Sequence, residues 1–126
     1  MRGPLAIVLL LTAHTASAQP AARSYSAGEA GTVLGREVVD AAGEDVGRLV
    51  DILVDKDGRP LAGLIDVGGF LGVGARRAAV AWRLLRFVNT DGAIRVVMDL
   101  TYDAAAAAPE FLGPGNTLIV IDPPPP

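Results

Sequence analysis

The segment from Val67 to Gly74 constrains the fold more than any other part of the sequence. Four glycines flank three large apolar side chains, Phe70, Leu71 and Val73, directly after a stretch that alternates like a β-strand. Glycine adopts backbone angles that other residues avoid, so this segment predicts a tight loop that presents apolar side chains between two strands. Few soluble folds use a loop of this kind.

Short β-strands joined by tight turns are predicted on both sides of this loop. Strand patterns occupy five segments, at about 36–39, 46–55, 61–67, 77–82 and 94–100. Turn residues with glycine separate several of them, at 40–44, 56–58 and 89–92, as is typical of β-hairpins. Residues 83–87 are expected to form a short turn. These patterns predict a mainly β fold, a small antiparallel β-barrel that is closed or partly open.

Three features modify this β pattern. The strand at 46–55 has apolar residues on both faces and is expected to bend at Gly47. Thr101 is expected to cap a short C-terminal helix that runs to Ala108 and ends at Pro109. Residues 117–121 are a candidate for one further edge strand.

The N-terminal 18 residues have the layout of a secretory signal peptide. Arg2 precedes the apolar run Leu5–Leu11, and a small-x-small site ends at Ala18. The run is shorter than the roughly 20 residues of a spanning helix, so an uncleaved anchor is the weaker alternative. We expect cleavage near Ala18 and a periplasmic or secreted bacterial protein. The remaining chain is divided into a flexible linker, a single domain and a Gly/Pro-rich tail, over 19–32, 33–112 and 113–126.

The composition excludes several kinds of catalytic and metal site. The chain has no cysteine, and its only histidine, His14, lies in the predicted signal peptide. Nucleophilic triads need an imidazole base, and Cys/His zinc sites need imidazole or thiolate ligands. We therefore predict no catalytic residue, no cofactor and no metal, and we expect the protein not to be an enzyme.

Three local patterns resemble ligand sites only superficially. The turn at 55–58 resembles a calcium loop, but the first and last ligand positions would be Leu53 and Leu64. The glycine loop lacks the Gly-Lys-Ser/Thr ending of a phosphate cradle and precedes a strand rather than a helix. Asp51, Asp55 and Asp66 are more simply explained as solvated carboxylates than as an acid–base pair.

Charge is unevenly distributed along the chain. The formal net charge is −3, or −4 once Arg2 is removed, which argues against nucleic-acid binding. Residues 37–66 contain eight acidic and three basic residues, whereas residues 76–95 contain five arginines and one aspartate. If these segments occupy different sides, the domain offers an anion-binding or head-to-tail docking face. The alternative is ordinary solvated charge on outward strand positions.

The order and spacing of several motifs resemble the PRC-barrel family over roughly residues 33–111. The motifs are Val33-Leu34-Gly35, Gly43 to Gly47, Val50 to Asp55, Asp57-Gly58, Val67 to Gly74, Val80-Ala81-Trp82, Leu100-Thr101 and Ala108 to Phe111. Ala81 departs from the proline that members usually carry there. The family includes the soluble domain of the photosynthetic reaction-centre H subunit and the C-terminal domain of a ribosome-maturation factor. The resemblance implies a barrel that binds rather than catalyses, without naming a partner.

Partner-binding residues are predicted in the glycine loop and in the arginines that follow it. Phe70, Leu71 and Val73 either cap the open end of the barrel or dock a partner. Trp82 is expected to pack in the core or plug the barrel end. The arginines predicted to flank such a docking patch are Arg76, Arg77, Arg83 and Arg86.

Two functions are compatible with these features. The first is a non-enzymatic binding or adaptor module of the bacterial cell envelope, which docks a protein or an anionic surface. The second is a self-assembling structural envelope protein, in which barrels pair edge to edge through Leu118–Ile121 or head to tail through opposite charges.

Overall fold

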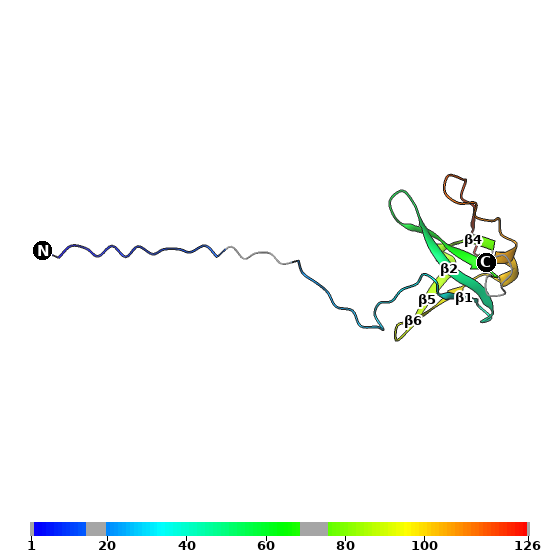
Figure 1. Cartoon of the computed structure of the whole chain (residues 1–126), viewed down its shortest axis with the longest axis horizontal. Coiled ribbons are helices and arrows are strands. Elements are labelled where there is room, and N and C mark those ends of the chain that lie inside the picture. The colour runs from blue at the N-terminus through cyan, green and yellow to red at the C-terminus, as the bar shows by residue number, and fades with distance from the viewer. Residues whose placement is uncertain (1, 15–19, 69–75, 126) are drawn as a thin grey trace.

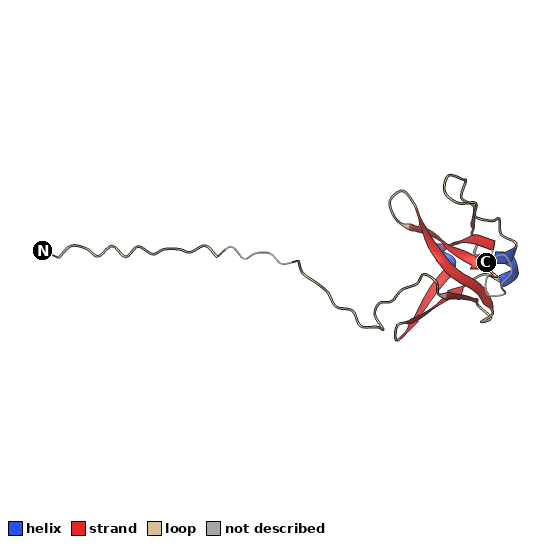
Figure 2. Cartoon of the chain, viewed as in Figure 1, coloured by secondary structure: helices blue, strands red, loops and turns tan. Residues whose placement is uncertain are grey.

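One strongly twisted sheet forms most of the domain (Figures 1 and 2). The structure is a computed structural model that describes residues 2–14, 20–68 and 76–125. Within these ranges the sheet has seven strands in the order β5-β6-β1-β2-β3-β4-β7. The strands are β1 (Glu37–Asp40), β2 (Asp45–Val54), β3 (Pro60–Val67), β4 (Arg76–Ala81), β5 (Leu85–Thr90), β6 (Ala93–Met98) and β7 (Val120–Ile121).

Most neighbouring strands in the sheet are antiparallel, and two pairs are parallel. β1 pairs in parallel with β6, and β7 pairs in parallel with β4. The sheet curls around its interior without closing, so β5 and β7 are its edges. The predicted mainly β fold is confirmed in the form of a partly open barrel with one short helix.

Aliphatic side chains from six of the strands and the helix fill the barrel interior. The fully buried large ones include Val38, Leu49, Ile65, Val96 and Met98. The chain has no disulfide to support this core. Burial of each such side chain stabilises the fold by roughly 1.5–3 kcal/mol.

Two glycines allow the close approaches that this curvature needs. A Cβ at Gly47 would lie 1.9 Å from the Asp66 carbonyl oxygen on β3. The β1–β2 pairing shifts register beside Gly47, as expected for a bent barrel strand. A Cβ at Gly63 would lie 2.4 Å from Leu85 and 2.9 Å from Leu49, so Gly63 leaves room for these side chains inside the barrel.

The expectation of a turn at 83–87 was wrong. A 3₁₀ turn, η2 (Trp82–Leu84), is followed directly by strand β5, which pairs with β6 along its whole length. Leu85 and Phe87 point toward the core and Arg86 and Val88 away from it, which is the alternation of a strand. The ring centroids of Trp82 and Phe87 lie 5.2 Å apart. Both rings pack against the core, as predicted for Trp82.

The short helix α1 (Tyr102–Ala106) follows β6 and packs against the core through Ala105. The Thr101 side chain accepts a hydrogen bond from the Ala104 amide, as predicted for its N-cap. Ala81, which replaces the usual proline, has a φ of −51°. This angle lies within the range that a proline ring would fix, so the departure is compatible with the same turn.

The segments outside the barrel differ in how they contact it. Residues 2–14 have no helix or strand and extend away from the domain (Figure 1). The predicted linker contacts the barrel from Ala27 onward, because the Asn89 side chain donates hydrogen bonds to the Ala27 and Gly28 carbonyls. No helix in the described ranges is long and apolar enough to span a membrane.

Candidate functional site

The three apolar residues of the predicted docking loop, Phe70, Leu71 and Val73, lie outside the described residues. The choice between a barrel cap and a docking patch therefore stays a prediction. The four arginines predicted to bind a partner all lie within the described part of the chain.

These arginines are divided between the two ends of β4. Arg76 and Arg77 begin β4, whereas Arg83 lies in η2 beyond its other end and Arg86 lies on β5. Two of them bind the chain itself. The Arg76 guanidinium donates to the Ala108 carbonyl at 2.7 Å, and Arg83 forms an ion pair with Asp122 at 2.6 Å. Whether these four arginines bind a partner stays a prediction.

The acidic and basic segments of the sequence meet in one row across the outer surface. The pairing places Glu37 opposite Arg48, Arg48 opposite Asp66, and Asp66 opposite Arg77. The parallel register of β1 and β6 places Arg95 beside Glu37 at the start of this row. Opposite charges on neighbouring strands attract one another, so along this row the acidic and basic segments alternate in charge instead of occupying different sides of the domain.

The pKa of Glu37, at the start of this row, is raised above its ordinary value. A side-chain hydrogen bond with Asp45, and repulsion between the two carboxyl groups, raise the pKa of Glu37, and slight desolvation acts in the same direction. The positive charges of Arg95 and Arg48 lower it. The increase shows that Asp45 outweighs both arginines at this position.

The outward side of the β5–β6 pair is hollowed at two places. We call this surface the open face, formed by three outward residues of β5 and their partners on β6: Arg86, Val88 and Thr90 opposite Val97, Arg95 and Ala93. A hollow of about 330 Å³ lies at one end, bordered by Arg83, Arg86 and Asp99. A second hollow of about 450 Å³ lies at the other end, bordered by Val88, Arg95 and Glu37.

The open face lies beside the free edge of the sheet. β5 pairs with β6 on one side and ends the strand order of the described sheet on the other. In an antiparallel pair, alternate residues direct their N–H and C=O groups away from the partner strand. The free side of β5 therefore presents backbone donors and acceptors next to the hollowed surface.

Residues 27–33, which we call the N-terminal arm, contact the β5–β6 hairpin on the side opposite to the open face. A Cβ at Gly31 would lie 2.7 Å from the Ile94 side chain, and Val33 packs against the barrel core. The Asn89 side chain lies on the same side of β5 as the inward Phe87. It donates hydrogen bonds to the Ala27 and Gly28 carbonyls. The arm therefore covers the inward side of the hairpin and does not cover the open face.

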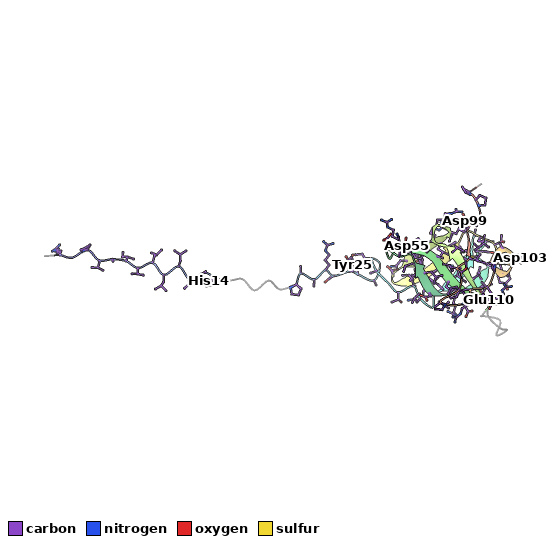
Figure 3. All side chains as sticks on the ribbon, turned by 90° about the horizontal axis from the view of Figure 1, so that it is seen from above. His14, Tyr25, Asp55, Asp99, Asp103 and Glu110 are labelled. Atoms are coloured by element: carbon purple, nitrogen blue, oxygen red, sulfur yellow. The ribbon has the colours of Figure 1, made fainter. Side chains whose placement is uncertain are left out.

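Charged side chains of both signs border the two hollows of the open face. Arg86 and Asp99 border one hollow, and Glu37 and Arg95 border the other. Across the described ranges, no three His, Asp or Glu side chains cluster as a metal site would require. His14 lies on the extended N-terminal segment, far from the labelled Asp99 of the barrel (Figure 3).

Sequence reasoning missed most of this surface because it missed β5. Arg86 was predicted as a partner-binding residue, but Val88, Arg95 and Asp99 were not. The signal was present as the period-two alternation from Leu85 to Thr90, with inward Leu85 and Phe87.

Comparison with known proteins supports the barrel and leaves the partner open. No curated protein matches the sequence. The family model described as the PRC-barrel domain matches residues 29–103, from the arm that contacts the hairpin to the first turn of α1. With the match covering more than half of the sequence and the structure forming the expected partly open barrel, the chain belongs to the PRC-barrel domain family.

Proposed function

We propose that the chain is a non-enzymatic binding module of the bacterial cell envelope that docks an extended segment of a protein partner on the open face. The observation that carries this proposal is the position of β5, which is an edge strand of the sheet formed by the described residues and lies beside two hollows. An extended peptide can add to such an edge as a further strand, with side chains placed in neighbouring depressions.

The mixed charges favour a protein over an anionic surface. A membrane or other anionic surface is attracted best by a face of one sign. Instead, Arg86 and Asp99 border the hollow at one end of the open face, and Arg95, Glu37 and the exposed Val88 border the hollow at the other. A polypeptide can match both signs and the apolar position together, which also provides specificity.

The signal-peptide pattern supports the envelope location. Positive Arg2, the apolar run at 5–11 and the small residues ending at Ala18 form the three regions of a secretory leader. The location is tested by expressing the chain with a C-terminal tag and measuring the mass of the exported protein. We expect a mature N-terminus at Gln19, whereas an intact tagged protein in the cytoplasm would contradict this part of the proposal.

Site-specific photocrosslinking in the native envelope tests the docking site. A photoreactive residue at Val88 is compared with one at Leu61, because both side chains are 43% exposed and only Val88 lies on the open face. We expect one discrete crosslinked protein from Val88 and none from Leu61. Equal labelling at both positions, or none at Val88, would contradict docking on β5.

Self-assembly remains the second candidate function. One observation favours it: Val120 and Ile121, within the segment predicted for edge pairing, form the other edge strand of the sheet. Static light scattering at low and high salt separates the two candidates. A monomer at both salt concentrations supports the binding module, and a salt-sensitive oligomer supports charge-driven assembly.

A further inference from the structure

The sheet carries a second apolar cluster outside the barrel interior. We call it the tail-covered face, formed by the buried outward side chains of Ala62 and Leu64 on β3 and Ala79 on β4. The chain after α1 covers this face with Phe111, Leu118 and Val120. The predicted Gly/Pro-rich tail therefore includes part of a packed layer.

Few interactions hold the end of this tail in place. β7 pairs with β4 through only two register positions, Ala79 with Val120 and Val80 with Ile121. Beyond β7, the Arg83 side chain pairs with Asp122 and donates to the Pro123 carbonyl, and both charged side chains are about half exposed. A strand attached this lightly can open locally at a small fraction of the total unfolding free energy.

An exposed turn separates the two halves of the cover. The Phe111 amide donates to the Arg77 carbonyl at 2.8 Å, so the chain is anchored to β4 before the turn. The turn contains Gly113 and Gly115, both with positive φ, and Leu112 beside it is 71% exposed. Rotation within residues 112–117 can therefore redirect β7 without disturbing Phe111.

We propose that β7 is an exchangeable strand, and that two copies of this chain associate by placing residues 117–123 of each on β4 of the other. The exchanged contacts are the same as those within one copy, so exchange needs no new complementary surface. The segment that docks is therefore the tail of a second copy. Its Leu118 and Val120 pack on the tail-covered face, and its Asp122 pairs with Arg83. This association uses β4 and β7 and is independent of docking on β5.

Residues 112–117 act as the hinge of β7. The length of this hinge determines whether β7 pairs with β4 of its own copy, the closed form, or with β4 of another copy, the exchanged form. The turn at 113–116 allows the tail to fold back on its own barrel, because the chain reverses there. A shortened hinge strains this return while leaving the strand able to reach a neighbour, so it favours the exchanged form. A variant lacking residues 113–116 is therefore expected to be a dimer by light scattering at concentrations where the unmodified chain is mostly monomeric.

Mixing two single-cysteine variants detects the exchange directly, because the chain has no cysteine of its own. One variant carries Ala79→Cys and the other Val120→Cys, so a disulfide between positions 79 and 120 can form only between two molecules. Equimolar variants are unfolded together, refolded at high concentration and oxidised. We expect the 79–120 disulfide by peptide mass spectrometry, with at least a tenfold higher yield after joint refolding than after mixing the folded proteins.

A double variant with both cysteines controls for disulfide geometry. It is expected to form the bond within one molecule at low concentration, which shows that the two positions can be joined. Absence of the intermolecular bond in the mixed sample, with the double variant bridged, would overturn the proposal. A monomeric variant lacking residues 113–116 would overturn it even if the double variant failed to bridge.

Discussion

The two outer faces of the sheet differ in what their sequences require of the rest of the chain. On β3, four consecutive residues from Ala62 to Ile65 are buried, so both sides of the strand need a cover. On β5, inward Leu85 and Phe87 alternate with exposed Arg86, Val88 and Thr90. The tail supplies the cover for β3, whereas β5 can remain in contact with solvent or a partner.

This comparison separates stability from binding. The tail-covered face continues the apolar packing of the domain on its outside, so changes there are expected to lower the free energy of unfolding. The open face contributes little packing, so changes there are expected to affect association alone.

Truncating one apolar side chain on each face gives the largest contrast. Leu64 is 2% exposed, and Leu64→Ala is expected to lower the free energy of unfolding by about 2–4 kcal/mol. Val88 is 43% exposed, and Val88→Ala is expected to lower it by less than about 0.5 kcal/mol. Urea unfolding followed by circular dichroism measures both, and equal losses would remove the distinction between the faces.

Placing a charge on neighbouring tail residues tests whether the tail is a packed cover. Leu118 packs against the tail-covered face, so Leu118→Asp is expected to lower the free energy of unfolding by roughly 1–3 kcal/mol. Ile119 is 56% exposed, and Ile119→Asp is expected to have little effect. Thermal unfolding provides the measurement, and a tail that only rests on the surface would tolerate both substitutions.

Arg83 and Arg86 lie at the same end of the barrel, and their substitutions are expected to give a smaller difference in the free energy of unfolding. Arg83→Ala removes the ion pair with Asp122 and is expected to lower the free energy of unfolding by about 0.5 kcal/mol, less at high salt. Arg86→Ala is expected to leave stability unchanged, because Arg86 makes no side-chain hydrogen bond to any described residue. A reversed order, measured at low ionic strength, would place Arg86 in the fold rather than on a docking surface.

The pH dependence of Glu37 is expected to be the smallest effect. Because the folded pKa of Glu37 is raised, its contribution to stability is present when pH is below the unfolded pKa. That contribution is lost as pH rises through the folded pKa, where the Glu37 carboxyl loses its proton beside Asp45. Glu37→Gln is expected to flatten this shallow dependence in the pH range just above the ordinary pKa of a glutamate. A steeper dependence in the variant would mean that Arg48 and Arg95 dominate the site.

The sequence was sufficient to predict the fold class, the family and the short helix, because these depend on local patterns. Alternation in β6, the glycine turns and the Thr101 cap act over a few residues and determine the structure near them. The bend near Gly47 followed from apolar residues on both faces of β2, a signal of the same local kind.

The sites depended on pairings between distant segments, which a single sequence does not reveal. Asp66 meets Arg77 and Arg48 only through the register of three strands, so the alternating charge row could not be derived from charge counts. The tail's position on β4 likewise depends on a parallel pair formed by residues about forty positions apart. The one local error was β5, where an alternating strand was interpreted as a turn.

Amide hydrogen exchange of the full chain tests the central distinction most directly. The account predicts slow exchange, close to the global unfolding limit, for the buried amides of β3, which pair with β2 on one side and β4 on the other. It predicts that about half of the β5 amides, those pointing away from β6, exchange much faster. Uniform protection of β5, equal to that of β3, would contradict the claim that one face is covered by the chain itself and the other is left for a partner.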